Sequence, residues 1–332
     1  MARMDASPAA LPTFADVLTA AVRIAPHAHV TPVQRARSID VLAGCELLFK
    51  CEQLQRAGAF KFRGACNAVW ALPDDIAARG VVTHSSGNHG AALALAARTR
   101  GIGCHVVVPE GAVASKLVAI EAYGATLHRC APTIAAREAR CAEVQRETGA
   151  TLVHPYTDPR VIAGQATAAL ELLNAHPGLD ALVVPVGGGG LASGTALAVA
   201  AIAPECRLYV AEPAGAAETA ASLAAGARVT DFVPDTICDG LRGTLGDINF
   251  TMLRAHAVEA LVVDDADTIA AMRLLWSRMK QLVEPSSATA LAAVLRNRER
   301  FAGQRVGVLL SGGNVDLDAL SPLFAAGNDA PR

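Results

Sequence analysis

The sequence predicts an α/β protein with two domains built on parallel or mostly parallel sheets. The main observation is a regular alternation of strand-like and helical segments between residues 80 and 202. Strands that alternate with helices imply parallel sheets with right-handed crossovers. The second observation is composition, because 332 residues with 52% hydrophobic and 18% charged side chains can form a large core.

The expected elements follow one another with recognisable boundaries. The first helix covers residues 13–25, capped by Thr13 and ended by Pro26, and residues 29–33 are extended. A strand over 46–50 leads to a helix over 62–72. The alternation then gives strands at 81–83, 105–108, 126–128, 151–153 and 181–184, helices at 89–98, 115–122, 133–147, 161–174 and 192–202, and a late apolar strand at 306–310.

Charge and cysteine usage exclude several classes of function. A net charge of -2 shows no bias toward nucleic acid or anionic membranes, and no apolar run is long enough to span a bilayer. The eight cysteines form no CxxC pair, and the first residues lack the pattern of a signal peptide. We therefore expect a cytoplasmic protein with reduced thiols that acts on a small molecule.

A polar loop follows the strand at 81–83, where ligands of parallel sheets bind. Ser85, Ser86, Asn88 and His89 stand among glycines at the start of a helix. Helix N-termini attract anions, so the loop suits a carboxylate. The alternative is an ordinary helix cap, which would use one or two of these side chains.

Four glycines, Gly187, Gly188, Gly189 and Gly190, follow the strand at 181–184 and precede a helix that continues with Leu191. Such a loop can close around a phosphate, which the helix N-terminus then binds. The run also fits a weak dinucleotide fingerprint, with Glu212 as the ribose-binding acid. A nicotinamide-dependent oxidoreductase is therefore an alternative.

Lys61 lies between two aromatic residues, one of which is Phe60. Burial lowers the pKa of a lysine because it disfavours the ammonium, and a neutral amine can form a Schiff base. The alternative is a lysine whose ammonium reaches water. A third loop, at Ser311, follows the strand at 306–310 and could contact a ring nitrogen or a sugar.

Together these segments resemble the fold-type II pyridoxal-phosphate enzymes, which share the tryptophan synthase β-like fold, and within them the serine/threonine dehydratase and serine racemase family. The matching blocks cover nearly the whole chain in the family's order: residues 50–55 and 58–65, 85–90, 161–165, 187–190, 283–286 and 311–314.

The resemblance implies how pyridoxal phosphate is held. Lys61 would carry it as a Schiff base, with Phe60 against the ring. The phosphate would bind Gly187 to Gly190 and the Leu191 N–H. Asn88 would bind the ring hydroxyl and Ser311 the ring nitrogen.

The resemblance also implies the chemistry, a β-elimination of water that turns a 3-hydroxy amino acid into a 2-oxo acid and ammonia. The substrate carboxylate would bind Ser85, Ser86, Asn88 and His89 while Lys61 takes the Cα proton. Ser86 occupies the position of the racemases' second acid/base, so serine racemisation is an alternative activity. Tyr156 resembles the dehydratase residue where a racemase has asparagine.

Substrate preference is expected to depend on two small residues. Ala91 stands where the family usually has glutamine, and Gly243 replaces a pocket serine. Both changes favour a bulky β-substituent, as in 3-phenylserine. Serine, threonine and 3-hydroxyaspartate are the alternatives, the last because Arg137 resembles a pocket arginine of the family.

Glu212, Glu218 and the Ala216 carbonyl resemble the family's cation site, with ligands suited to Mg²⁺ or Ca²⁺. The alternative is a solvated carboxylate pair. We further expect a large domain (1–79 and 158–332), a small substrate domain (80–157) and a homodimer. A non-catalytic amino-acid-binding protein would keep the carboxylate loop but would not need a sheltered lysine.

Overall fold

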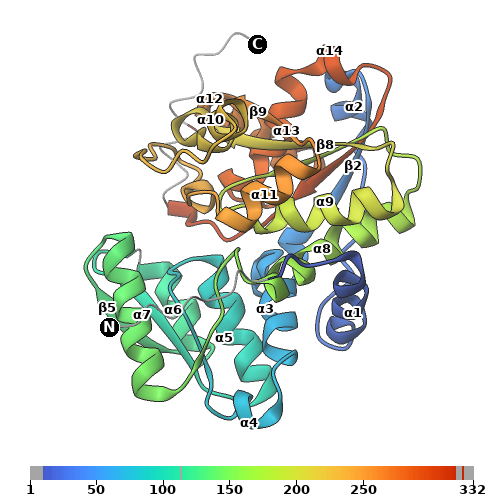
Figure 1. Cartoon of the computed structure of the whole chain (residues 1–332). Helices are drawn as coiled ribbons and strands as arrows, with labels where there is room; N and C mark the ends of the chain where they lie inside the picture. Colours follow the sequence, from blue (N-terminus) through green and yellow to red (C-terminus); the bar gives the residue numbers. More distant parts are fainter. Residues whose placement is uncertain (1–9, 113, 319–323, 325–332) are drawn as a thin grey trace.

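The computed structural model describes residues 10–112, 114–318 and 324 and contains two sheets (Figure 1). The larger sheet has the order β1-β2-β10-β7-β8-β9 and the smaller one β5-β4-β3-β6. Every strand pair is parallel except β1 with β2. The predicted α/β class with mostly parallel sheets is confirmed. The strands are β1 (Val33–Gln34), β2 (Glu46–Cys51), β3 (Val81–Thr83), β4 (Cys104–Pro109), β5 (Thr126–Cys130), β6 (Thr151–Leu152), β7 (Ala181–Pro185), β8 (Arg207–Pro213), β9 (Glu259–Val263) and β10 (Arg305–Leu310).

Helices cover both faces of each sheet (Figure 1). In the larger sheet, Phe49 and Val183 pack into one core with α13, whereas Leu48 and Leu182 pack into another with α8 and α9. Successive side chains of a strand point to opposite faces, so strands buried on both faces need continuous apolar runs. The helices are α1 (Phe14–Ile24), α2 (Arg37–Ala43), α3 (Lys61–Trp70), α4 (Asp74–Ala77), α5 (Asn88–Arg100), α6 (Ala114–Ala122), α7 (Ile134–Thr148), α8 (Pro159–Ala175), α9 (Gly190–Ile202), α10 (Glu218–Ala225), α11 (Asp247–Ala255), α12 (Asp265–Leu274), α13 (Pro285–Arg296) and α14 (Arg298–Phe301).

Helix α3, which begins with Lys61, connects the two halves of the molecule. It packs against α5, which covers the smaller sheet, and against α8, which packs on α9 of the larger one. In Figure 1 the helices α5, α6 and α7 gather in the lower half with α3 beside α5, and α8 lies between α3 and α9 of the upper half. Lys61 is therefore placed where the two halves meet.

The N-terminal segment and the cysteines agree with the sequence prediction in part. Thr13 caps α1 through a capping box with Asp16, as the sequence indicated. Within the extended segment at 29–33, pairing begins only at Val33, and it is antiparallel to β2. The eight cysteines are free thiols. Among the described helices, none is both long and apolar enough to cross a membrane.

Candidate active site

The Lys61 side chain is partly buried at the start of α3. Its Nζ donates a hydrogen bond to the Pro155 carbonyl at 3.1 Å and lies 5.1 Å from the centre of the Phe60 ring. Burial lowers the pKa of Lys61 to about 8, although the negative charge of Glu284 opposes the shift. A useful fraction of the amine is therefore neutral near physiological pH, as nucleophilic attack on a carbonyl requires.

A buried ion network fixes the helix that carries this lysine. The Arg63 guanidinium donates from Nε to Glu52 Oε2 at 2.7 Å and from Nη1 to Glu171 Oε1 at 2.6 Å. The side chains of Arg63 and Glu52 are fully buried, while that of Glu171 is 23% exposed. Two bonds to each carboxylate fix both position and angle, so the first turn of α3 is held against β2 and α8.

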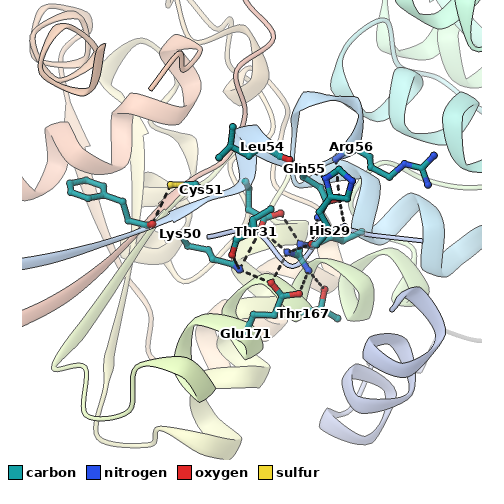
Figure 2. Close-up of polar contacts among 12 residues, drawn as sticks. His29, Thr31, Lys50, Cys51, Leu54, Gln55, Arg56, Thr167 and Glu171 are labelled. Carbon is teal, nitrogen blue, oxygen red and sulfur yellow. Dashed lines mark hydrogen bonds and ion pairs between the residues drawn. The ribbon is translucent and has the colours of Figure 1, made fainter. Parts of the chain in front are cut away.

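Lys50 completes the same network from β2. Its Nζ contacts Glu171 Oε2 at 2.5 Å and donates to the Thr31 carbonyl at 2.8 Å. Figure 2 shows Lys50, Thr31, Thr167 and Glu171 converging on one point below the strand. Two cations thus face two carboxylates, and their charges balance in the interior.

The predicted carboxylate loop lies between β3 and α5. Gly87 is the N-cap of α5 and no side chain caps the first turn, so its N–H groups are open to an anion. His89 is buried, and its Nε2 contacts the Val153 carbonyl at 3.2 Å. Burial, together with the charge of Lys61, keeps the pKa of His89 well below its usual value, so the ring is neutral. Because Nε2 must donate to a carbonyl, His89 can offer an anion its backbone N–H but not a ring proton.

Asn88, the first residue of α5, has both ends of its side-chain amide engaged. Nδ2 donates to Glu284 Oε1 at 2.8 Å, and Oδ1 accepts from Asn314 Nδ2 at 2.9 Å. Sequence reasoning placed Glu284 and Asn314 in matching blocks without giving either a role. Their partners lie roughly 200 residues away in the chain, so the only available signal was their place inside those blocks.

The tetraglycine loop joins β7 to α9, and its shape requires glycine. Gly189 has φ +94° and is the N-cap of α9. A Cβ on Gly188 would lie 2.3 Å from Cδ1 of Tyr156, and one on Gly190 would lie 3.0 Å from the Tyr156 Cα. No side chain caps this helix, so its first N–H groups can bind a phosphate, and Leu191 lies buried within the same turn.

Ser311 follows β10 and lies beside the lysine segment. It is buried, its carbonyl accepts from the Phe60 N–H at 2.9 Å, and the next residue, Gly312, bridges to Ala59. The structure therefore brings Phe60, Lys61 and Ser311 together. A lysine amine, an open helix N-terminus and a serine fit an aldehyde, a phosphate and a ring nitrogen of one cofactor.

Tyr156 lies over the tetraglycine loop. Its ring packs edge-on against His154, with the two ring centres 4.6 Å apart, and burial raises the pKa of its hydroxyl. A Cβ on Gly243 would lie 3.6 Å from the Gly188 nitrogen and 3.9 Å from Cε1 of Tyr156, both ordinary contact distances, so a Cβ would fit there. Ala91 instead lines a cavity of about 630 Å³ with Asn88 and residues 314–318. The two small residues thus have different neighbours.

Arg137 projects from α7. Its Nε is buried and has no hydrogen-bond partner among the described residues. Burial lowers the pKa of His84; Glu138 opposes this shift and the charge of Arg137 adds to it. Since His84 directly precedes Ser85, Arg137 lies near the carboxylate loop.

Glu212 and Glu218 are both buried at the end of β8. Glu212 accepts from the N–H groups of Thr219 at 3.1 Å and Ala220 at 2.6 Å. Oε2 of Glu218 has no hydrogen-bond partner in the described part of the chain. Burial raises the pKa of Glu212 to about 7, and burial with the Glu212 charge raises the pKa of Glu218 to about 8. An orphaned oxygen beside a second carboxylate fits a cation.

The carbonyl of Ala216 would have to complete such a site. Ala216 is buried two residues before Glu218. Among the described residues, no group of three His, Cys, Asp or Glu side chains could hold a metal ion. A cation here would therefore depend on backbone oxygen as well as on carboxylates.

Comparison with known proteins gives the family. A model of pyridoxal-phosphate dependent enzymes matches residues 24–312. The chain is 48% identical to a β-hydroxyaspartate dehydratase of Paracoccus denitrificans (strain Pd 1222), covering 93% of this chain and 98% of the relative. It is 44% identical to a serine racemase of Dictyostelium discoideum, covering 96% and 99%. The structure of maize serine racemase superposes with a TM-score of 0.92 at 44% identity, covering 96% and 98%. The chain therefore belongs to the fold-type II pyridoxal-phosphate enzymes, in the serine/threonine dehydratase and serine racemase family.

Proposed function

We propose that this protein is a dehydratase, or ammonia-lyase, that converts a 3-hydroxy amino acid to a 2-oxo acid and ammonia. The observation that carries the proposal is the enclosed Lys61 amine, whose burial lowers its pKa to about 8. Pyridoxal phosphate, when bound, supplies an aldehyde for the amine and a ring that withdraws electrons from Cα. The residues described above would hold it and move the protons.

The binding roles follow from the geometry. Gly187 to Gly190 and the Leu191 N–H would hold the phosphate at the N-terminus of α9. Asn88 would donate to the ring hydroxyl with the Nδ2 proton that Glu284 leaves free, and Phe60 would pack on the ring. Ser311 would face the ring nitrogen. Because a serine carries no charge, it would not keep the ring nitrogen protonated as a carboxylate would. The ring would then withdraw electrons less strongly, which favours elimination.

The catalytic roles divide between the two faces of the substrate. Ser85, Ser86, Asn88 and the His89 backbone N–H would bind the carboxylate at the start of α5. Lys61 would take the Cα proton, and the β-hydroxyl would leave as water. Ser86 would face the opposite side of Cα, so slow racemisation of serine is the alternative activity.

We propose a substrate with an anionic β-substituent, 3-hydroxyaspartate, ahead of serine and threonine. The support is the buried Nε of Arg137, which has no hydrogen-bond partner in the described chain, and the 48% identity to a β-hydroxyaspartate dehydratase. A bulky substrate such as 3-phenylserine stays a prediction. The separate surroundings of Ala91 and Gly243 give it less support.

Two substitutions on one helix test the substrate. Arg137→Leu should lower kcat/KM for 3-hydroxyaspartate by about 10- to 100-fold, the effect of a lost charged hydrogen bond, and should change that for serine much less. Arg140→Leu is the matched control, because Arg140 pairs with Glu143 at the surface of the same helix. Equal losses for both substrates would refute the assignment of Arg137. Highest turnover with 3-phenylserine would refute 3-hydroxyaspartate.

The reaction class is tested at the lysine. Lys61→Ala should abolish the visible absorbance of bound cofactor and the production of 2-oxo acid and ammonia, whereas Lys280→Ala, at an exposed lysine, should keep both. Chiral analysis of the remaining serine measures racemisation. If Lys61→Ala keeps the absorbance and the activity, the proposal is wrong.

We also propose that Glu212, Glu218 and the Ala216 carbonyl hold Mg²⁺ or Ca²⁺. The support is the buried, unsatisfied Oε2 of Glu218 beside a second buried carboxylate.

Finally, we propose a homodimer in the cytoplasm, with a small domain at 80–157. All strands of the smaller sheet lie within that range, and α1 exposes aliphatic side chains such as Val22, which is 78% exposed. Native mass measurement tests the oligomer, and limited proteolysis tests the domain boundaries.

A further inference from the structure

Glu284 lies at the N-terminus of α13, where segments from distant parts of the chain meet. Its side chain is 3% exposed and its backbone N–H donates to the Gly312 carbonyl at 3.0 Å. A Cβ on Gly312 would lie 2.7 Å from Glu284 Oε1, so only a glycine leaves room for the carboxylate in this position. The charge is thus built into the interior beside Ser311 and the start of α3.

The carboxylate fixes the amide of Asn88. Asn88 donates to Glu284 and accepts from Asn314, whose Nδ2 also donates to the Ala57 carbonyl at 2.7 Å. Rotating the Asn88 amide by half a turn would place oxygen against the carboxylate and NH₂ against NH₂. Both contacts would be repulsive, so one orientation is selected. That orientation leaves one Nδ2 proton for a ligand.

The same charge acts on the Lys61 amine. Burial lowers the pKa of Lys61, and the charge of Glu284 raises it. Two imidazoles interact with the lysine as well, but burial keeps the pKa of His89 well below its usual value and lowers the pKa of His154 to about 3. Both rings are neutral at pH 7, so neither contributes a charge that acts on the Lys61 amine, and the negative charge comes from Glu284.

We propose that Glu284 is a positioning residue for the Lys61 amine, holding Asn88 in one orientation and supplying the buried negative charge that favours the lysine ammonium. The inference rests on the proposed function, in which Lys61 is the reacting amine. When a proton moves from Cα to Nζ, the negative charge of Glu284 stabilises the ammonium that forms. The same charge slows the capture of an aldehyde, which needs the neutral amine.

Glu284→Gln separates the orientation of Asn88 from the effect of the charge on Lys61. Glutamine keeps the shape and the acceptor for Asn88 but removes the charge. The full-length protein, stripped of cofactor, is mixed with pyridoxal phosphate from pH 6 to 9.5, and the visible absorbance of the bound cofactor is followed. In the wild type, capture should be half-maximal near pH 8, the pKa of Lys61. In the variant the midpoint should fall by about one pH unit, which gives roughly fivefold faster capture at pH 7. Turnover of the loaded variant should fall.

Controls separate charge from structure. Glu284→Asp keeps the charge and should keep the midpoint near that of the wild type, and Glu259→Gln, at a surface carboxylate, should change neither rate nor midpoint. Asn314→Leu should weaken retention of pyridoxal phosphate without moving the midpoint. An unchanged or raised midpoint in a folded Glu284→Gln protein overturns the inference alone. A wild type that shows no Lys61-dependent absorbance removes the proposed function and the inference with it.

Discussion

Replacing Arg63 by methionine should destabilise the protein far more than an equivalent change at its surface. The substitution removes two hydrogen bonds to each of Glu52 and Glu171 and leaves Glu52 fully buried. Breaking a buried ion pair typically costs about 3–5 kcal/mol, because the remaining charge has lost its partner. Lys50 stays 4.0 Å from Glu52 and Glu171 reaches water, so we expect the lower end, about 3 kcal/mol.

The matched control is Arg300→Met. Arg300 contacts Glu259 at 2.5 Å, as short as the buried contacts, but the two side chains are 42% and 54% exposed. Exposed pairs contribute below about 1 kcal/mol because water and salt screen them. The difference between the two variants therefore isolates the effect of burial.

Urea unfolding of the full chain, followed by circular dichroism and extrapolated linearly, measures both free energies of unfolding. The double variant Arg63→Met, Glu52→Gln should recover part of the loss, because it removes the unpaired charge. If Arg63→Met loses no more stability than Arg300→Met, or if the double variant recovers nothing, the electrostatic reasoning is wrong.

Three further predictions concern the tetraglycine loop, stability at low pH and the proposed cation site. Gly188→Ala should weaken pyridoxal phosphate binding at least tenfold on titration, because its Cβ would lie 2.3 Å from Tyr156; Gly103→Ala, which meets nothing within 4 Å, should not. Burial raises the pKa of Glu52, but Arg63, Lys50 and Thr31 together lower it by more, so the net shift is downward. The stability that this shift contributes is present above the ordinary carboxyl pKa and is lost as pH falls through the lower folded value. The unfolding free energy should therefore drop below about pH 4 in the wild type, and less in Glu52→Gln. Chelator should lower the melting temperature of wild type but not of Glu218→Gln, and equal responses would refute the cation site.

Much of the fold could be predicted because its signal is local. Each buried strand is a short apolar run between glycines or polar residues, so the expected strand at 81–83 matches β3 and the one at 181–184 differs from β7 by one residue. The pairing of β1 could not be predicted because it has no such local signal. Two residues carry no periodicity, and their antiparallel partner lies elsewhere in the chain.

The candidate site also contains residues with a local signal in the sequence and residues without one. The segments around Lys61, Asn88 and Gly188 were found because loop chemistry at strand ends is visible in the sequence. The function of Glu284 was not, because it depends on an amide 196 residues away. The ring orientation of His89 likewise follows from the Val153 carbonyl, which spacing alone does not place. Contacts that cross between the two sheets have no local signature.

The surroundings of the Lys61 amine come from segments far from it in sequence. The Pro155 carbonyl follows β6 of the smaller sheet, and Glu284 is the N-cap of α13 on the larger sheet, while Arg63 anchors the helix that carries the lysine. A shift of either sheet would change the burial that lowers the lysine pKa or the charge that raises it. The pKa of the Lys61 amine therefore depends on residues from both halves of the molecule.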